Sequence, residues 1–213
     1  PSFPDEDPYH NGYMKENLLV KLDLESGDFD LVLGFPSKYK SGGFWGGADH
    51  ILPSIAKSED PDQLYVSFPI EDSVFVFDLR SNTLSPSHLA KSNIINDIIA
   101  QPVFSNDRTN RIKYQLSTDY YFSIVYDPYR DLYYRFASQK YTDEAIADIL
   151  SKRSGMPNKN SLLVFDSNWN LKGEYHLTSD SNGYLFFVFS SGAYIVSKND
   201  EEEILHLFRI ADL

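Results

Sequence analysis

The chain offers few residues for chemistry, and the first candidate is a histidine that follows an acid. Asp49 and His50 are adjacent, and a histidine held by a carboxylate can act as a general base. A histidine that is hydrogen-bonded within a turn is the alternative, which we favour because adjacent side chains usually point apart. We keep His50 as a candidate binding residue.

Other reactive groups are scarce. None of the five histidines has a metal-ligand spacing such as HxH or HExxH. The chain has no cysteine, which excludes disulfides, thiolate metal sites and a cysteine nucleophile. No nucleophile-elbow or calcium-loop pattern occurs. The sequence therefore predicts no catalytic residue, no metal and no cofactor.

A glycine-rich loop holds two large aromatic residues side by side. Phe44 and Trp45 stand between the two glycine pairs of the loop 42–47, which lacks the spacing of a phosphate-binding loop. These rings could stack on a sugar or insert into a partner, since rigid aromatic side chains lose little entropy on binding. The alternative, which we favour, is that they fill space between packed β-units.

A basic residue lies in the most strongly apolar hairpin of the chain. The run Tyr133-Tyr134-Arg135 follows strand alternation, which places Tyr133 and Arg135 on one face and Tyr134 on the other. Arg135 could present its guanidinium to an acidic ligand, with Tyr133 beside it. The alternative, which we favour, is an ion pair with Asp127 or Asp131 across the hairpin.

The acidic residues that recur along the chain have a structural explanation. Apolar runs end at Asp23, Asp78, Asp127 and Asp166, and a looser run ends at Arg209; the successive spacings are 55, 49, 39 and 43 residues. An aspartate at the end of a strand commonly accepts hydrogen bonds from its own turn. We therefore expect these residues to stabilise turns and not to catalyse a reaction.

The same spacing predicts the fold, because the blades of β-propellers repeat at roughly 40–50 residues. We expect an all-β, β-propeller-like array of antiparallel blades, three to four in number and possibly part of a six- or seven-bladed propeller, with two short helical excursions. The predicted elements are hairpins over 17–34, 64–79, 120–137, 161–177 and 184–210, helices over 94–99 and 142–154, and a loop over 105–111.

Composition limits the partners. The 213 residues carry a net charge of −12, which repels nucleic acid and anionic membranes at long range. No apolar run approaches the roughly 18 residues that span a bilayer. The first residue is Pro1 and not methionine, so we expect a processed or truncated product. We predict one propeller-like domain over residues 1–213, the C-terminal part of a longer protein.

The stretch from Ser123 to Arg135, with its Tyr-Asp-Pro and Tyr-Tyr-Arg motifs, resembles a family of uncharacterised propeller-like lipoproteins of Bacteroides-type bacteria. The family is a domain of unknown function that is similar to six-bladed propellers of the TolB and NHL kind. The run Ser161 to Asp166 and the segment from Tyr184 to Ile210 fit the same plan. The resemblance implies export to the periplasm or cell surface, a lipid anchor outside this chain, and no known activity.

Our functional hypothesis is a non-catalytic binding module of an exported bacterial protein that presents blade loops to a protein or glycan partner. The candidate binding residues are Phe44, Trp45, His50, Tyr133 and Arg135, and we expect Trp45→Ala to weaken binding with little loss of stability. One alternative is a glycan-acting hydrolase or lyase with a site in a propeller channel. Another is a structural or assembly fragment without a ligand of its own.

Overall fold

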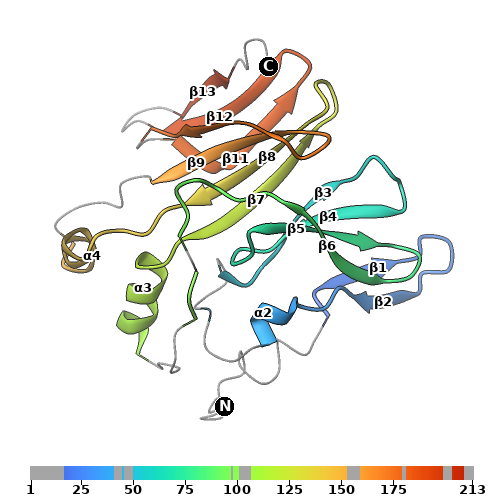
Figure 1. Cartoon of the computed structure of the whole chain (residues 1–213), viewed down its shortest axis with the longest axis horizontal. Helices are drawn as coiled ribbons and strands as arrows, with labels where there is room; N and C mark the ends of the chain where they lie inside the picture. The colour runs from blue at the N-terminus through green and yellow to red at the C-terminus, as the bar shows by residue number, and fades with distance from the viewer. Residues whose placement is uncertain are drawn as a thin grey trace.

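The computed structural model describes residues 17–40, 45, 50–96, 98–100, 107–152, 159–178, 181–198 and 203–208. In these residues the chain forms antiparallel β-sheets with short helices in the connections between them (Figure 1). The all-β fold predicted from the repeated apolar runs is therefore confirmed, with each sheet built from strands that are neighbours in the sequence.

The strands form four sheets in chain order. The first sheet holds β1 (Leu19–Leu22) and β2 (Phe29–Val32). The second holds β3 (Ser54–Lys57), β4 (Gln63–Ser67), β5 (Ser73–Asp78) and β6 (Thr83–Leu89). The third holds β7 (Tyr120–Asp127), β8 (Leu132–Ser138), β9 (Asn160–Asp166) and β10 (Leu171–His176). The fourth holds β11 (Ser181–Phe189), β12 (Gly192–Lys198) and β13 (Glu203–Phe208).

The third sheet is packed on both faces, and β8 shows how. Successive side chains of a strand point to opposite faces. Tyr133 belongs to a core cluster shared with the second sheet, which also holds Phe68 and Phe77. Tyr134 and Phe136 belong to a second cluster, shared with the fourth sheet. The predicted alternation at Tyr133 and Tyr134 is therefore confirmed, and it makes β8 a completely buried central strand.

Three helices lie in the connections: α2 (Ser37–Lys40), α3 (Arg108–Leu116) and α4 (Asp143–Leu150). The prediction of a helix that begins after Thr142 is confirmed, since the Thr142 side chain accepts a hydrogen bond from the amide of Ala145. The loop predicted over 105–111 is wrong in part. Asp107 caps α3 by accepting a hydrogen bond from the amide of Thr109, and the helix begins at Arg108.

The helix predicted over 94–99 is wrong, because residues 94–96 and 98–100 are irregular. Their apolar side chains serve the core without a helix, since Ile95 and Ile98 are buried in the first cluster. The amide of Asn96 donates to the side chain of Asp119, which lies far along the chain. A distant carboxylate thus accepts a backbone hydrogen bond that a helix would have made internally.

The connections divide the array into two edges (Figure 1). We call one the turn edge: it holds the turns that follow β1, β3, β5, β7, β9 and β11. We call the other the connection edge: it holds the segments between β2 and β3, β4 and β5, β6 and β7, and β8 and β9, with all three helices. Binding residues concentrate in loops that a rigid scaffold positions, so a binding site is expected on the connection edge, which has the longer connections and the helices.

Candidate functional site

Arg135 is the most elaborately bonded side chain of the connection edge. It lies on β8, is fully buried, and donates all five of its N–H groups to the second sheet. The acceptors are the hydroxyl of Ser67 at 2.9 Å and the backbone carbonyls of Phe68 at 3.5 Å, Glu71 at 2.6 Å, Asp72 at 3.0 Å and Ala90 at 2.7 Å. The guanidinium therefore fastens the β4–β5 connection to the third sheet.

The electrostatics of Arg135 agree with that role. Burial lowers the pKa of Arg135 to about 10, so the side chain stays charged near neutral pH. The guanidinium carbon lies 3.6 Å from the ring centroid of Tyr121, which is a cation–π contact. Neither Asp127 nor Asp131 accepts from Arg135, so the ion pair expected across the hairpin is wrong.

Both of those aspartates are bound elsewhere. Asp127 forms an ion pair with Arg130 at 2.7 Å and accepts a hydrogen bond from the hydroxyl of Tyr134 at 2.9 Å. Asp131 accepts from the hydroxyl of Tyr126 at 3.1 Å. Alternation explains the outcome, because the Arg135 side chain leaves β8 on the face that meets the second sheet.

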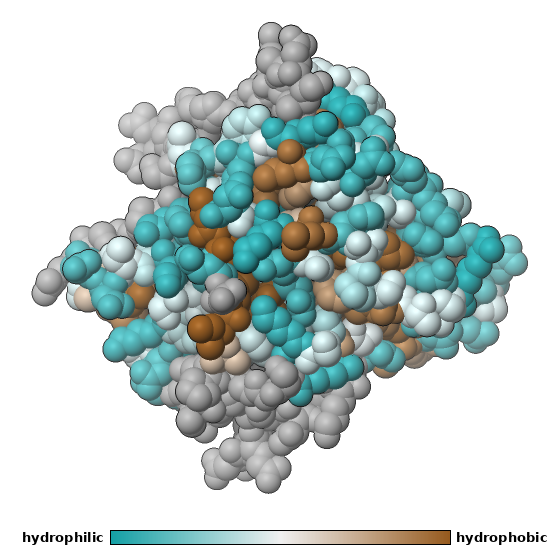
Figure 2. All heavy atoms as spheres, viewed as in Figure 1, coloured by the Kyte–Doolittle hydropathy of each residue, from teal (hydrophilic) through white to brown (hydrophobic). Residues whose placement is uncertain are grey.

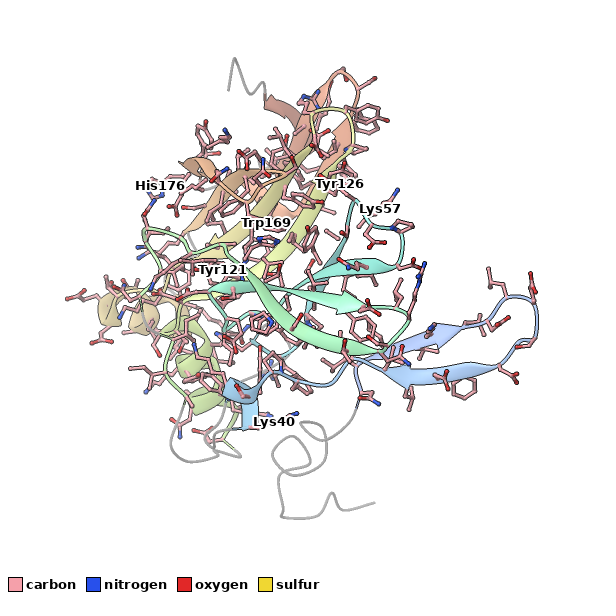
Figure 3. All side chains as sticks on the ribbon, turned by 45° about the vertical axis from the view of Figure 1, so that its right-hand side comes forward. Lys40, Lys57, Tyr121, Tyr126, Trp169 and His176 are labelled. Carbon is pink, nitrogen blue, oxygen red and sulfur yellow. The ribbon has the colours of Figure 1, made fainter. Side chains whose placement is uncertain are left out.

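Tyr121 extends the network around Arg135 (Figure 3). Its hydroxyl donates to Asp72 at 2.9 Å and accepts from the amide of Ser92 at 3.0 Å. Asp72 in turn pairs with the exposed Lys91 at 3.2 Å. Burial raises the pKa of the Tyr121 hydroxyl well above its usual range, which keeps it protonated as a donor. This network is a junction between two sheets and leaves no donor aimed at solvent from Arg135.

His50 lies in an aromatic pocket. Its ring centroid is 4.7 Å from that of Tyr120 and 5.7 Å from that of Tyr114. Both ring nitrogens are buried and have no hydrogen-bond partner in the part of the chain that the structure describes. Burial lowers the pKa of His50 to about 4, so the imidazole is neutral near pH 7. Its neighbour Asp49 lies outside the described residues.

The aromatic candidates also pack in the core. Trp45 is only 4% exposed and its ring centroid lies 5.9 Å from that of Tyr39. Tyr133 stacks on Trp169 at 4.7 Å and is completely buried. Phe44 lies outside the described residues. The structure thus places Trp45 and Tyr133 in one core cluster, and a direct binding role for the candidate residues stays a prediction.

The recurrent aspartates bind their own turns, as predicted. Asp23 accepts from the amides of Glu25 and Ser26, Asp78 from those of Arg80 and Ser81, Asp127 from those of Tyr129 and Arg130, and Asp166 from those of Asn168 and Asn170. Burial raises the pKa of Asp166, but the groups of Asn170 and Lys172 that bind it outweigh this effect and lower the pKa to about 2.

A residue in the left-handed region completes each of these turns. Gly27, Asn82 and Asp131 have φ values of 78°, 54° and 55° and stand four positions after their aspartates, while Trp169 with φ 63° stands three after Asp166. Such residues let the chain reverse tightly into the next strand. The aspartate of each turn thus binds within its own turn, and the turn after β7 is in addition tied to the turn after β11, because Arg130 donates to the carbonyls of Phe189 and Ser190.

A groove on the connection edge escaped the sequence analysis. It has a volume of about 570 Å³ and lies between α3 and α4, which are neighbours in Figure 1. One helix contributes Asn110, Lys113, Tyr114 and Ser117, and the other Asp143, Ile146, Ala147 and Leu150. The groove depends on a helix that begins within 105–111, where the sequence pattern favours a loop, although Asp107 is a recognisable helix cap.

The two walls of the groove differ in chemistry. Each helix presents positions i, i+3, i+4 and i+7, which form one stripe along a helix face. The α4 stripe has an apolar floor from Ile146 onward, whereas the α3 stripe is polar. The Tyr114 hydroxyl donates to the carbonyl of Ile99 at 3.0 Å, and burial raises its pKa to about 12. The arrangement suits a ligand with one apolar and one polar side.

Comparison with known proteins identifies the family. The model of a domain of unknown function, DUF4221, matches residues 6–176. The chain therefore belongs to the DUF4221 family, and the resemblance to an uncharacterised Bacteroides-type family is confirmed at that level. None of the curated proteins compared with this chain matches it.

A solved structure supports the fold. The crystal structure of a DUF4221 family member from Bacteroides vulgatus is similar, with a TM-score of 0.68 and 21% sequence identity over 88% of this chain. The match covers 51% of that protein, so the chain spans about half of its length. Within the described residues, no helix is long and apolar enough to cross a membrane.

Proposed function

We propose that the chain is a propeller-like, non-catalytic binding module of an exported bacterial protein, and that it holds a segment of a partner protein in the groove between α3 and α4. The observation that carries the proposal is the pair of helix stripes that face each other across that groove. Export has a separate basis, which is the sequence resemblance to predicted lipoproteins.

A propeller-like arrangement is supported by the order of the sheets. The second and third sheets are four-stranded meanders, as blades are. Their first strands, β3 and β7, contact each other, and β7 also contacts β11. Blades around a common axis place their first strands together in this way. The connections of such an array reach solvent on one side, where the groove lies.

The walls of the groove favour a peptide over a glycan. Ile146, Ala147 and Leu150 offer an apolar floor of the kind that holds hydrophobic side chains. Lys113 and Asp143 carry opposite charges on facing walls, and neither side chain has a partner among the described residues. A volume of about 570 Å³ is within the range of ligand sites. Tyr114, the aromatic residue among those that line the groove, already donates its hydroxyl to the carbonyl of Ile99, and Trp45, the ring expected to stack on a sugar, is buried outside the groove.

The test is to block the groove. Peptides selected from a random display library on the intact chain, and a glycan array run beside them, provide the probes. We expect Ala147→Trp to weaken the binding of a selected peptide at least tenfold. Glu144→Trp places the same side chain on α4 outside the groove and is the matched control. Selected peptides that bind Ala147→Trp unchanged, or binding of glycans alone, would overturn the peptide site.

A further inference from the structure

The first sheet exposes an apolar face. In the hairpin of β1 and β2, Val20 stands opposite Leu31 and Leu22 stands opposite Phe29. Residues opposite each other in an antiparallel pair share a face. These four side chains and the neighbouring Leu24 are between 54% and 89% exposed. Figure 3 shows the hairpin extending away from the other sheets, so this face, the hairpin face, is open to solvent.

The opposite face of the same hairpin is covered only at one end. Val32 is buried in the first core cluster, and Leu19 packs against that cluster. Further along this face Lys21 stands opposite Asp30, and both are exposed. The polar side of the hairpin therefore reaches solvent with charged residues, whereas the hairpin face reaches it with apolar ones, and a contiguous exposed apolar patch is typical of an interaction surface.

The other end of the array repeats the pattern. Along β11, Phe186 and Val188 pack on the third sheet through the second core cluster. Leu185, Phe187 and Phe189 alternate with them and are between 39% and 51% exposed. We call these three the β11 face. The first and fourth sheets therefore each present exposed apolar side chains on their outer face.

The interior of the molecule shows what fits such a face. The third sheet packs face to face with both the second and the fourth through large apolar side chains. Sheets that stack this way bury alternate residues of each strand. The hairpin face and the β11 face have the same alternation and the same residue types, so another antiparallel sheet is the occupant that they suit. Figure 2 shows hydrophobic residues reaching the surface among hydrophilic ones.

We propose that the chain pairs with a second copy of itself, with the hairpin face of each copy packed on the β11 face of the other. The two faces are different surfaces, so each junction is head-to-tail, and two copies close the assembly through two such junctions.

The exposed apolar area is large enough for a stable interface if two junctions form, but not if only one junction forms. At about 100 Å² of apolar area per half-exposed side chain, the eight residues of one junction bury on the order of 800 Å². Two junctions bury on the order of 1,600 Å², which is the size of a standard stable interface. A single junction would fall among weak contacts, so the closed pair is the stable form.

The net charge of the chain predicts how the association of two copies depends on salt concentration. Each copy has a net charge of −12, so two copies repel each other at low ionic strength. Salt screens that repulsion while leaving apolar contacts intact. Association should therefore strengthen as salt is added, which is the opposite of what an interface built on ion pairs would show.

The test is analytical ultracentrifugation of the full chain from low to high micromolar concentration. We expect a monomer–dimer equilibrium, and we expect Leu22→Glu and Phe187→Glu each to raise the dissociation constant at least tenfold. Leu89→Glu is the control: Leu89 is 69% exposed on β6 and lies outside both faces, so this variant should leave the dissociation constant unchanged. Melting temperatures verify that the three variants fold, because each changed side chain is exposed.

Mixing the two variants separates head-to-tail pairing from its alternatives. In a mixed dimer both substitutions fall at one junction and the other junction is intact, so the mixture should associate more strongly than either variant alone. If Phe187→Glu has no effect, two hairpin faces pair with each other and the proposal is wrong. A wild-type chain that stays monomeric at every concentration and salt level also overturns it.

Discussion

The chain reverses between antiparallel strands at both edges of the array, but the hydrogen bonds described at the two edges join partners at very different distances along the chain. At the turn edge, the aspartate carboxylates of residues 23, 78, 127 and 166 accept hydrogen bonds from amides two to four positions away. At the connection edge, Arg135 binds carbonyls that lie 45 to 67 positions away.

The two edges therefore differ in how far the effect of a substitution extends through the fold. A turn that is bonded within itself can be altered while the sheets stay together, because its partners are its own neighbours. A connection that is bonded to another sheet carries the contact between the sheets. The connection edge also has the helices, the groove and the buried His50, so the proposed binding site lies on the same edge as the contacts that hold the second and third sheets together.

The largest effect is expected where the contacts are most distant. Arg135→Met would leave four backbone carbonyls of the second sheet without their donor, and we expect the free energy of unfolding to fall by about 4 kcal/mol. Arg80→Met makes the same change at the turn edge, where the exposed guanidinium pairs with Asp62 of the neighbouring turn, and should change the free energy of unfolding little. Urea unfolding of both variants measures the contrast. Equal losses would show that the two edges do not differ.

Trp45→Ala removes a core side chain of the connection edge, and its burial corrects the expectation of a small stability change. Because Trp45 is 4% exposed, we expect a loss of about 3 kcal/mol. Trp45→Phe keeps an aromatic ring and should recover much of that loss. Thermal unfolding is the measurement, and a melting temperature unchanged by the alanine variant would place the indole at the surface.

His50 should make the connection edge sensitive to acid. Its pKa is lowered from 6.5 to about 4 in the folded state by burial, so the unfolded chain binds the proton more readily. Stability is therefore retained above pH 6.5 and lost as pH falls toward 4, by about 2–3 kcal/mol. His50→Phe fills the same aromatic pocket and should lack this loss. Parallel pH profiles of the two proteins would contradict the assignment.

The smallest effect is expected at the turn edge. Asp78→Ala removes the acceptor for the amides of Arg80 and Ser81 and should lower the melting temperature by about 2–4 °C. Asn82 has φ 54°, so Asn82→Gly should be tolerated. Differential scanning calorimetry measures the melting temperatures of both variants. A destabilisation by Asp78→Ala as large as that by Arg135→Met would show that the two edges do not differ.

The features that sequence predicted correctly are local ones. The turn after Asp78 needs only residues within four positions, and the cap of α4 needs only Thr142 and Ala145. Likewise, strand alternation around Arg135 assigned its face correctly. The all-β class followed from these units because antiparallel strands joined by short turns pair with their neighbours.

The features that sequence missed depend on distant partners. The segment after Ser92 has the apolar spacing of a helix, but Asp119 and Glu174 accept hydrogen bonds from its amides, and no pattern within the segment reveals them. The partners of Arg135 are backbone carbonyls, which every residue has, so side-chain composition could not identify them. The groove could not be predicted either, because one of its walls is α3. The sequence of this helix is polar, and its N-terminal cap at Asp107 is the one local sign of a helix.

The guanidinium of Arg135 also determines which parts of the molecule unfold together. It lies on one four-stranded sheet and completes the hydrogen bonding of the other, so neither sheet can open alone without leaving a buried charge or bare carbonyls. The two sheets should behave as one cooperative unit in native-state hydrogen exchange, with amides of β4 and β8 exchanging at a common free energy. The β1–β2 hairpin is outside this unit and should exchange first.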